Sequence, residues 1–364
     1  MKSRTINVGV IGCGVISNAY FNAAKKFAAM KIVAVADIRP EAAKAAAEKH
    51  GYRAMTVKAL LADPGIEAVL NLTVPAAHAK VNEAILKAGK HAYVEKPFAT
   101  DRASGKRVMA LAKKMKLQVG GAPDTFLGGS HQTCREMIDK GAIGKVTTGM
   151  AFACCHGHES WHHNPAFFYR KGGGPLFDIA PYHITALVNM LGPVKRVAAI
   201  NNRAQNERIS TQPALKGRKI PVRVDTNYSA TLQFASEAVI TLVTSYDTWK
   251  GYNWHIELHG TKASLRVPDP NRFGDPIMIC EPGEREWKPV PTTHGYTDNM
   301  RSLGLADMCR SLADKSTPAR CGGDLVYHVL DIMCAIEESS KTGRHIKIQS
   351  TCARPAPLPR KAKL

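Results

Sequence analysis

The chain has 364 residues, of which 45% are hydrophobic and 22% charged, and its 50 Lys and Arg against 30 Asp and Glu give a formal net charge of +20. This length suits two domains, and no apolar run is long enough to cross a bilayer, so we expect no membrane-spanning segment. The basic residues are scattered and no nucleic-acid motif accompanies them, so we expect no specific binding of nucleic acid. The nine cysteines are odd in number and irregularly spaced, which indicates reduced thiols and a cytoplasmic location rather than a disulfide framework.

The first third of the chain alternates short apolar runs with Ala-rich amphipathic stretches. Helices are expected between the runs, for example over 41–50 and 76–88. This alternation is typical of a parallel, doubly wound sheet. We therefore predict an N-terminal α/β domain over residues 1–122, with strands at 6–11, 32–36, 68–73, 91–94 and 117–121.

A Gly-rich turn follows the first expected strand, and an acidic residue ends the second. In the turn, Gly12 permits a tight bend and Gly14 lets the backbone approach a pyrophosphate at the N-terminus of the next helix. Asp37 can accept hydrogen bonds from an adenosine ribose. These features predict a Rossmann domain that binds a dinucleotide. The expected contacts at the two turns are Gly12, Gly14, Val15, Ile16, Asp37, Ile38 and Arg39.

The charge on Asp37 bears on which dinucleotide is bound. A carboxylate at this position would repel the 2′-phosphate of NADP, which favours NAD. Arg39 offers an alternative, because it could pair with that phosphate and accept NADP. Since Arg39 directly precedes Pro40 at the expected start of a helix, we interpret it as a solvated residue and predict NAD.

Polar residues also follow the third and fourth strands, at the carboxyl edge where open α/β sheets bind ligands. After the third strand, Thr73, Pro75 and His78 are expected on the cofactor side. After the fourth strand come Glu95 and Lys96, which we also expect to contact the cofactor. A lysine at this edge can hydrogen-bond a substrate hydroxyl and relay its proton during hydride transfer. Lys96 is therefore a candidate catalytic residue.

The pattern of apolar and polar residues changes after residue 122. Longer runs with alternation and β-branched residues begin at residue 146, and helical patterns occupy 132–140, 299–312 and 323–340. We predict a C-terminal α+β domain over 123–350, with a large, open, mostly antiparallel sheet. Residues 351–364 are basic and Pro-rich, so we expect a disordered tail. The expected strands are 194–201, 222–234, 237–245, 254–258, 263–267 and 344–348.

Two segments of this second domain carry polar residues of interest. The histidine-rich segment 154–163 lacks the spacing of a metal site, so we expect no metal and interpret it as a loop that contacts a hydroxylated substrate. Further along, a Gly-rich turn enters a helix in which Asp178 and Tyr182 share one face, and His183 points about 100° away. Asp178 near the helix start could instead be a cap. The expected substrate contacts are Lys96, Asp124, His158, Trp161, His162, Asp178 and His183.

These motifs resemble the Gfo/Idh/MocA family, named for glucose–fructose oxidoreductase and inositol dehydrogenase. The resemblance covers nearly the whole chain and rests on the turn at 12–14, the run from Gly89 to Pro97, the Gly-rich stretch that ends in Asp178, and Gly343-Arg344-His345. It implies NAD(P)-linked oxidation of sugars or cyclitols by a homodimer or homotetramer. It also implies that Lys96 is the active-site lysine and that Asp178 opens the family's Asp-x-x-x-His pair.

The sequence departs from the family pattern at one position. Four residues after Asp178 stands Tyr182, and a histidine follows only at His183. Either Tyr182 carries the proton or a local irregularity brings His183 into place. The leading hypothesis is an NAD-dependent dehydrogenase that takes hydride from a ring hydroxyl carbon of a sugar, glycoside or cyclitol. The alternatives are an NAD-retaining glycosidase that works by oxidation, elimination and reduction, and a non-catalytic sugar or NAD sensor.

Overall fold

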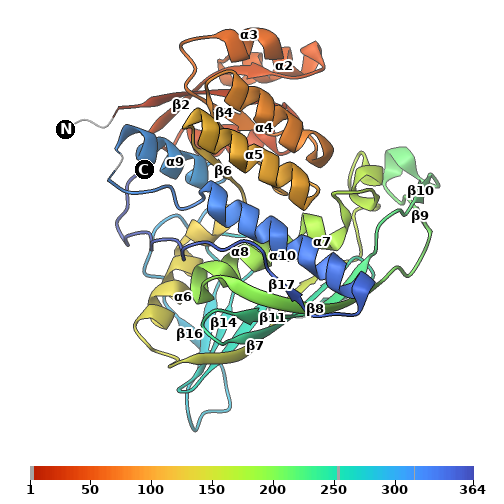
Figure 1. Ribbon diagram of the computed structural model, residues 1–364, viewed down its shortest axis with the longest axis vertical. Helices are drawn as coiled ribbons and strands as arrows, with labels where there is room; N and C mark the ends of the chain where they lie inside the picture. The colour runs from red at the N-terminus through yellow and green to blue at the C-terminus, as the bar shows by residue number, and fades with distance from the viewer. Residues whose placement is uncertain (1–3, 252–254, 315) are drawn as a thin grey trace.

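A six-stranded parallel sheet forms the first layer of the protein; the sequence predicted a parallel sheet with five of these strands and missed the two-residue strand β3. The structure is a computed structural model that describes residues 4–251, 255–314 and 316–364. The strand order is β3-β2-β1-β4-β5-β6, and every pairing in this sheet is parallel (Figure 1). The central strands are almost entirely buried, which explains their continuous apolar runs. The strands are β1 (Ile6–Ile11), β2 (Met30–Ala36), β3 (Arg53–Ala54), β4 (Ala68–Asn71), β5 (His91–Val94) and β6 (Val119–Gly121).

Helices connect these strands in the order expected of a doubly wound fold. Local signals set several of their ends: Pro40 opens α2, Gly51 ends it in a left-handed conformation, and the Asp101 side chain caps the first turn of α5. Helix α1 contacts β2, and α4 contacts β4, β5 and α5. The connecting helices are α1 (Ser17–Ala24), α2 (Pro40–His50), α3 (Val57–Ala62), the 3₁₀ helix η1 (Pro75–Ala77), α4 (His78–Lys87) and α5 (Arg102–Met115).

The second sheet has nine strands, all antiparallel neighbours except the parallel pair β7–β12. This confirms the mostly antiparallel sheet. Three strands were not predicted with bounds: β7, although strand-like runs were expected from residue 146, and the short strands β15 and β16 at one end of the sheet. The order is β16-β15-β14-β13-β7-β12-β11-β8-β17. The bounds are β7 (Val146–Cys154), β8 (Val194–Asn202), β11 (Asn227–Phe234), β12 (Val239–Ser245), β13 (Ile256–Gly260), β14 (Ser264–Val267), β15 (Ile277–Cys280), β16 (Lys288–Val290) and β17 (Ile346–Lys347).

The strand expected over 222–234 starts only at Asn227, because residues 222–226 form a connection without helix or strand that follows a separate hairpin. In this hairpin β9 (Glu207–Ile209) pairs with β10 (Lys219–Pro221), and the 3₁₀ helix η4 (Pro213–Leu215) lies between them. Residue 254 of the strand expected over 254–258 lies outside the described residues. The hairpin projects beside α7 in Figure 1.

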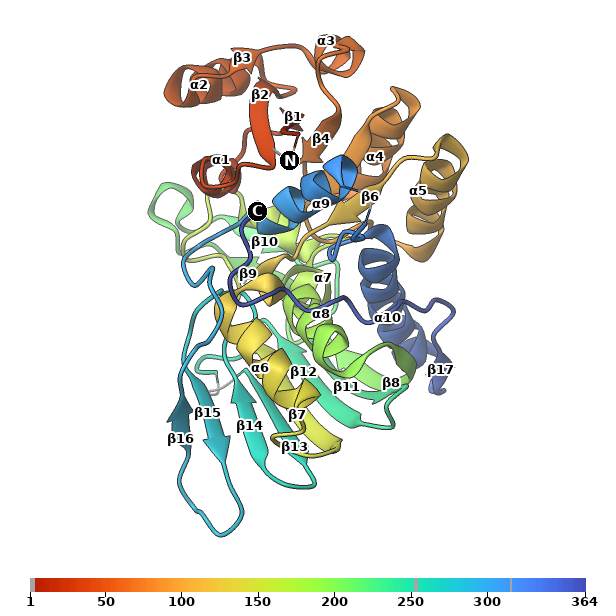
Figure 2. The ribbon, with the colours of Figure 1, turned by 90° about the vertical axis from the view of Figure 1, so that its left-hand side faces the viewer.

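Helices cover one face of the second sheet. Contacts join α6 to β14, α8 to β7 and α10 to β8, and Figure 2 shows these helices on the same side of the strands. On the uncovered face, Met150, Ile200 and Val239 are exposed. The helices of this part are η2 (Thr125–Leu127), α6 (Gly129–Asp139), η3 (Pro165–Tyr169), α7 (Gly174–Asp178), α8 (Ala180–Leu191), α9 (Leu303–Ala313) and α10 (Gly323–Thr342).

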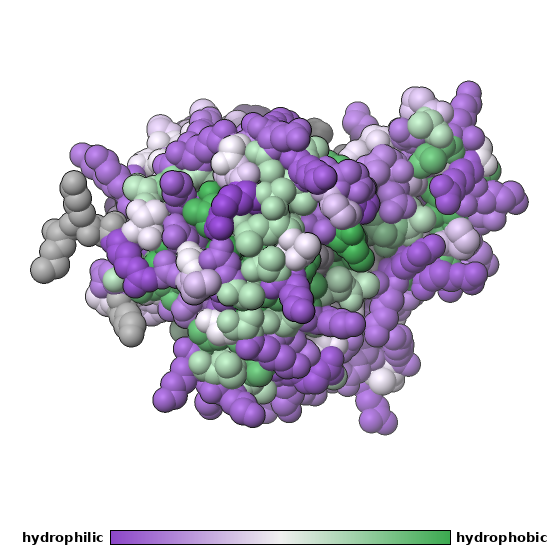
Figure 3. All heavy atoms as spheres, turned by 90° about the horizontal axis from the view of Figure 1, so that it is seen from above, coloured by the Kyte–Doolittle hydropathy of each residue, from purple (hydrophilic) through white to green (hydrophobic). Residues whose placement is uncertain are grey.

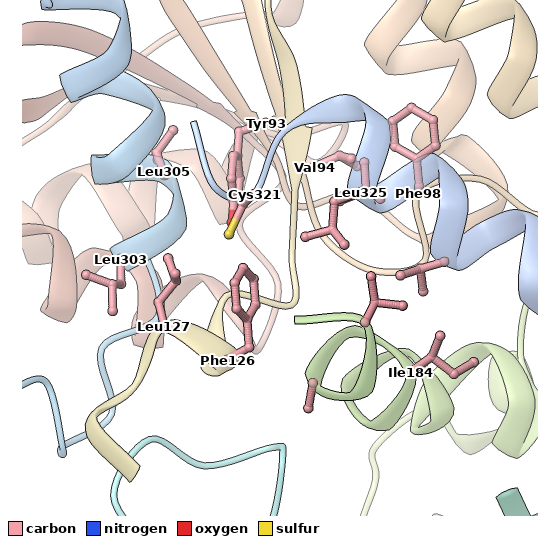
Figure 4. Close-up of a cluster of buried hydrophobic side chains, with 14 of the residues drawn as sticks. Tyr93, Val94, Phe98, Phe126, Leu127, Ile184, Leu303, Leu305, Cys321 and Leu325 are labelled. Atoms are coloured by element: carbon pink, nitrogen blue, oxygen red, sulfur yellow. The ribbon is translucent and has the colours of Figure 1, made fainter. Parts of the chain in front are cut away.

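After the second sheet the chain returns to the first one. Helix α9 contacts β1, β2 and β6, and α10 contacts β6 and α5. Figure 4 shows the resulting shared core, in which Tyr93 and Val94 of β5 meet side chains from η2, α8, α9 and α10. One continuous hydrophobic core therefore joins the two sheets. The predicted boundary at residue 122 does not show that α9 and α10, which come later in the chain, pack on the first sheet.

The expectation of a disordered tail over 351–364 is wrong, because this segment packs along the protein. Cys352 and Leu358 are buried, with 7% and 2% of their surface exposed. The Arg320 guanidinium donates hydrogen bonds to the carbonyl oxygens of Ala356 and Pro357 at 3.0 and 3.2 Å. Basic and Pro-rich composition predicts disorder only when no partner surface is available, and here buried groups supply one.

The outer surface matches the high net charge. Seen from above, hydrophilic side chains cover most of the face, and more hydrophobic residues form a broken strip between them (Figure 3). Among the helices of the described residues, none combines the length and the hydropathy that a membrane crossing requires.

Candidate active site

The turn after β1 has the geometry of a phosphate-binding loop. Gly12 has φ +106°, and a Cβ atom there would come within 2.6 Å of the Leu72 carbonyl group, so no larger residue fits. Beside Gly14, by contrast, the space is open to 4 Å. Among the described residues, the backbone amides of Gly14, Val15 and Ile16 have no hydrogen-bond acceptor. Exposed amides that precede α1 in this way fit a dinucleotide pyrophosphate.

Asp37 lies at the end of β2 and is held against the same turn. Its Oδ2 accepts a hydrogen bond from the Cys13 backbone amide at 2.8 Å, and its Oδ1 accepts one from the Arg39 amide at 2.9 Å. The Arg39 Nε lies 3.6 Å from Oδ1, and the Arg39 side chain is largely exposed. The carboxylate is therefore fixed at the position from which a ribose hydroxyl can be bound.

Apolar side chains face solvent at the carboxyl edge of this sheet. The exposed fractions are 64% for Val15, 93% for Ile38 and 58% for Val74. Thr73 and Pro75, in the same loop as Val74, are half-buried. Exposed apolar residues beside unpaired amides suit a ligand with flat rings and phosphates, so this edge fits the expected cofactor.

Lys96 and Asp178 form the centre of the candidate site. The Lys96 Nζ donates hydrogen bonds to Oδ1 and to the backbone oxygen of Asp178 at 2.7 and 2.8 Å. Lys96 follows β5 of the first sheet, whereas Asp178 ends α7 of the second part, so the pair joins the two halves of the protein. Both side chains are mostly buried, with 16% and 13% exposed.

The second oxygen of Asp178 binds two groups from other segments. Its Oδ2 accepts a hydrogen bond from the Tyr246 hydroxyl at 2.6 Å, and the His158 Nε2 lies 2.8 Å away. The same Nε2 is 3.1 Å from the Tyr246 oxygen. The structure thus brings together Lys96, Asp178 and His158, as expected for the substrate side. Tyr246 was missed, although its place directly after the strand ending at Ser245 was a usable signal.

These contacts shift the pKa values of the central pair. Burial disfavours the charge on Lys96, but the Asp178 carboxylate and other anionic groups outweigh it and raise its pKa above the ordinary value. Burial also acts against ionised Asp178, yet Lys96 and His158 hold its pKa well below the usual range. At neutral pH the pair is therefore an ion pair.

Tyr182 faces this pair, as the spacing from Asp178 predicted. The Lys96 Nζ is 5.3 Å from the centroid of the Tyr182 ring. Burial raises the pKa of the Tyr182 hydroxyl, and the charges of Lys96 and Arg301 counteract only part of that effect. Arg301, which sequence reasoning missed, is also hydrogen-bonded to Asn271 Oδ1 at 2.5 Å.

His183 is not brought to Lys96, so the alternative in which a local irregularity places it there has no support. Its Nδ1 lies 3.3 Å from the Ile179 carbonyl oxygen, and its ring is 5.8 Å from the His255 ring, on the side of the second sheet. Burial first, and His255 second, lower the pKa of His183 to about 4. Its role as a catalytic and substrate-contacting residue therefore lacks a geometric basis in this structure.

Two other predicted contacts, His78 and Asp124, are buried in the structure. His78 is buried, with Nδ1 2.7 Å from the Pro97 oxygen and Nε2 2.8 Å from the Thr73 oxygen, so it braces two loops beneath the cofactor edge. Asp124 is buried and its Oδ2 accepts hydrogen bonds from the backbone amides before and within α9, at Ser302 and Gly304. These placements contradict direct contact of His78 with cofactor and of Asp124 with substrate.

Glu95, another expected cofactor contact, is turned inward. Its Oε1 accepts a hydrogen bond from the Tyr20 hydroxyl at 2.7 Å, and its Oε2 accepts one from the Lys96 amide at 2.9 Å. Only 7% of its surface is exposed. The carboxylate thus ties α1 to the end of β5.

Residues of the histidine-rich loop line the outer part of the site. Trp161 is 59% exposed, and its ring meets the His158 ring edge to face at a centroid distance of 5.2 Å. His162 is nearly buried between Trp161 and Phe168. In the described residues no group of His, Cys, Asp and Glu has a metal-binding arrangement, and all nine cysteines are free.

Comparisons with known proteins agree with this geometry. Residues 6–121 match the family model described as an oxidoreductase family with an NAD-binding Rossmann fold. Residues 131–266 match the model of the GFO/IDH/MocA C-terminal domain.

Individual proteins are similar over most of the chain. The inositol 2-dehydrogenase of Rhizobium meliloti (strain 1021) is 29% identical over 301 residues, which cover 80% of this chain and 81% of that protein. The D-glucoside 3-dehydrogenase of Escherichia coli (strain K12) is 24% identical and covers 96% of this chain and 99% of its own length. A solved structure of levoglucosan dehydrogenase in complex with NADH has a TM-score of 0.83 at 23% identity, covering 95% of this chain and 100% of that one.

Proposed function

Because this chain belongs to the Gfo/Idh/MocA family of NAD-binding oxidoreductases, we propose that it oxidises a ring hydroxyl carbon of a sugar, glycoside or cyclitol. The similarity to inositol, levoglucosan and glucoside dehydrogenases supports this substrate class. The observation that carries the proposal is the buried ion pair between Lys96 and Asp178, placed at the same sheet edge as the dinucleotide turn.

The proposed chemistry needs a hydride acceptor and a proton acceptor. NAD, when bound at the turn after β1, supplies the hydride acceptor. Lys96, which stays charged, donates a hydrogen bond to the substrate hydroxyl and stabilises the negative charge that develops on its oxygen. Asp178 fixes the direction of the Lys96 ammonium group through Oδ1. Gly14, Val15 and Ile16 bind the pyrophosphate.

The proton acceptor is proposed from the groups around Lys96. Tyr182 lies close to the Lys96 charge, but its raised pKa keeps its hydroxyl protonated near neutral pH, so it can only relay a proton to a further base. His158 is the candidate for the base itself, and it replaces His183 in this role, because its imidazole contacts the Asp178 carboxylate. Imidazole is the side chain that ordinarily exchanges protons near neutral pH.

A substrate screen tests this function. Purified protein with NAD would be offered glycosides, free sugars and cyclitols, and NADH formation would be followed by its near-ultraviolet absorbance. Turnover with one of them is the expected result. Release of a free sugar without net NADH would favour the NAD-retaining glycosidase, and ligand binding without either change would favour the sensor.

The preference for NAD is tested separately. We expect tighter binding of NAD than of NADP by intrinsic fluorescence titration, because Asp37 would meet the 2′-phosphate with like charge. Asp37→Ser should narrow the difference, whereas the control Glu41→Gln, in the first turn of α2, should not. Tighter NADP binding by the unmodified protein would contradict this part and favour Arg39.

We also propose a cytoplasmic homodimer or homotetramer. The nine free cysteines support the location. For assembly, the uncovered face of the second sheet carries exposed Met150, Ile200 and Val239, an apolar surface that a second copy of the chain would cover. Light scattering after size-exclusion chromatography should give a multiple of the monomer mass, and Ile200→Glu should reduce it. A monomer in the unmodified protein would contradict the proposal.

A further inference from the structure

Arg208 is the buried centre of a network that lies behind the candidate site. It belongs to β9 of the hairpin, and only 5% of its side chain is exposed. Its Nη1 donates to Glu159 Oε1 at 2.6 Å and to the His156 carbonyl oxygen at 3.2 Å. Its Nη2 donates to the Tyr246 carbonyl oxygen at 2.9 Å and also pairs with Asp247. One guanidinium group therefore binds two separate segments of the chain.

Those two segments carry the two groups that bind Asp178 Oδ2. His158 lies between His156 and Glu159, and Tyr246 directly precedes Asp247. The loop of His158 contains no helix or strand between β7 and η3, so its position depends on individual anchors, both side-chain contacts and backbone hydrogen bonds to neighbouring segments. The fork of an arginine is suited to this task, because its N–H groups lie in one rigid plane.

The hairpin strengthens the hold on the first segment. The Glu159 carbonyl oxygen accepts hydrogen bonds from the backbone amides of Thr211 and Gln212, both at 3.0 Å, and from the Ser210 hydroxyl at 3.1 Å. The Tyr169 hydroxyl donates to the other Glu159 oxygen. Both the backbone carbonyl group and the side chain of Glu159 are thereby held in place, and Arg208 connects this residue to the Tyr246 segment.

We propose that Arg208 is a positioning residue, which holds His158 and Tyr246 in register on the Asp178 carboxylate that orients Lys96. The expected effect of Arg208 on turnover rests on the proposed function. Arg208 itself touches neither substrate nor cofactor. Its effect on the imidazole of His158 can be measured without either of them.

The test compares Arg208→Lys with a matched control, Arg203→Lys. Lysine keeps the positive charge beside Glu159 and Asp247 but cannot reach both segments at once. Arg203 precedes the same hairpin and is exposed, and within the described part of the chain its side chain donates a hydrogen bond only to the Val222 carbonyl oxygen, at 2.8 Å. Carbon-13 labelling of the histidine rings allows the signal of each imidazole to be followed by NMR at one pH, and His158→Gln identifies the His158 signal.

The expected result has two parts. In the otherwise unmodified protein, Asp178→Asn should shift the His158 ring signal, because the ring nitrogen lies against this carboxylate, and in the Arg208→Lys background this shift should shrink. Turnover of Arg208→Lys should fall roughly 10²-fold, as for a small misplacement of reacting groups, with the dissociation constant of NAD unchanged. Arg203→Lys should match the unmodified protein in both measurements.

Two outcomes would overturn the proposal. The first is a His158 ring signal in Arg208→Lys that responds to Asp178→Asn as strongly as in the control. The second is lost turnover with that response intact, which would indicate general damage. If no sugar is oxidised by the unmodified protein, the proposed function fails, but the NMR comparison still decides the role of Arg208. Should Arg208→Lys not fold, Glu159→Gln removes one ion pair at constant shape and is measured in the same way.

Discussion

The Asp178 carboxylate contacts three partners from other parts of the chain, and it stabilises the positive charge on Lys96. Oδ1 binds Lys96, and Oδ2 binds His158 and Tyr246. A carboxylate whose lone pairs are occupied in this way is poorly suited to take up a proton, and its lowered pKa agrees. Asp178 therefore orients and holds charge, and proton uptake falls to its neighbours.

Replacement of Lys96 by methionine keeps the length of the side chain but removes the charge and the donor. We expect kcat to fall roughly 10²- to 10⁴-fold, which is typical of losing a group that acts on the transferred proton. The dissociation constant of NAD, measured by fluorescence, should change little. Lys106→Met, at an exposed position on α5, is the control. Near-normal turnover of Lys96→Met on the true substrate would refute the assignment.

His183 predicts a specific dependence of stability on pH. Its pKa in the folded protein is about 4, below the value of about 6.5 in an unfolded chain, because burial disfavours its charged form. The unfolded chain therefore binds the extra proton first, and stability is lost as the pH falls from about 6.5 toward about 4. We expect this group to contribute a loss of about 1–3 kcal/mol over that range.

The measurement is urea unfolding at several pH values across that window. His183→Phe removes the titrating group, so its free energy of unfolding should depend less on pH than that of the unmodified protein. His255 and Asp269, the titratable groups nearest His183, remain in both proteins. Equal pH dependence in the two would show that His183 is not buried in its neutral form.

At the scale of elements, a break between two helices explains the order of the site residues. Asp178 ends α7, Ile179 separates the helices, and Pro181 lies in the first turn of α8. Sequence reasoning treated this region as one helix and still placed Asp178 and Tyr182 on one side, with His183 turned away. That part of the prediction survives because the break is a single residue.

Local sequence patterns explain why some strands were predicted and others were missed. Buried strands such as β1 and β5 are mostly apolar, which local patterns reveal. By contrast, β15 is a four-residue apolar run that was overlooked, and β16 is a three-residue edge strand with a weak pattern. The meeting of Lys96, His158 and Tyr246 depends on contacts across 62 to 150 residues of sequence, and no local pattern encodes it. His78 and Asp124 were misplaced for the same reason, since their burial arises only in the folded chain.

Asp124 predicts the behaviour of one helix. Because its carboxylate accepts hydrogen bonds from the amides at the start of α9, Asp124→Ala should lower the free energy of unfolding by about 1–3 kcal/mol. Asp124→Asn retains an acceptor oxygen and should lose less. Urea unfolding gives both values, and KM for the sugar should not change. A large rise in KM with normal stability would instead restore Asp124 as a substrate contact.

At the scale of the whole molecule, the segment 351–364 fastens the second part of the chain to the first. The Leu358 amide donates to Gln132 Oε1 at 2.7 Å on α6, and the Leu364 carbonyl oxygen accepts from the Ala28 amide at 3.1 Å, between α1 and β2. The segment thus spans from the helices over the second sheet to a loop of the first.

Leu358→Ala tests how much this segment contributes. Leu358 is buried, and truncating a buried leucine to alanine costs about 2–5 kcal/mol of unfolding free energy. Lys361→Ala, at an exposed position of the same segment, is the control and should change stability little. Urea unfolding monitored by tryptophan fluorescence measures both. Equal stability of the two variants would mean that the segment contributes nothing to the fold.

The return of α9 and α10 to the first sheet has a consequence for how the chain is made. The strands of that sheet are complete once residue 121 has left the ribosome, but their partners Leu303, Leu305 and Leu325 come much later (Figure 4). At about 5–20 residues per second, the first sheet waits roughly 10–40 s with apolar side chains uncovered. A nascent chain in this condition is a client for chaperones, and the N-terminal third would aggregate if it were produced without the helices that close it.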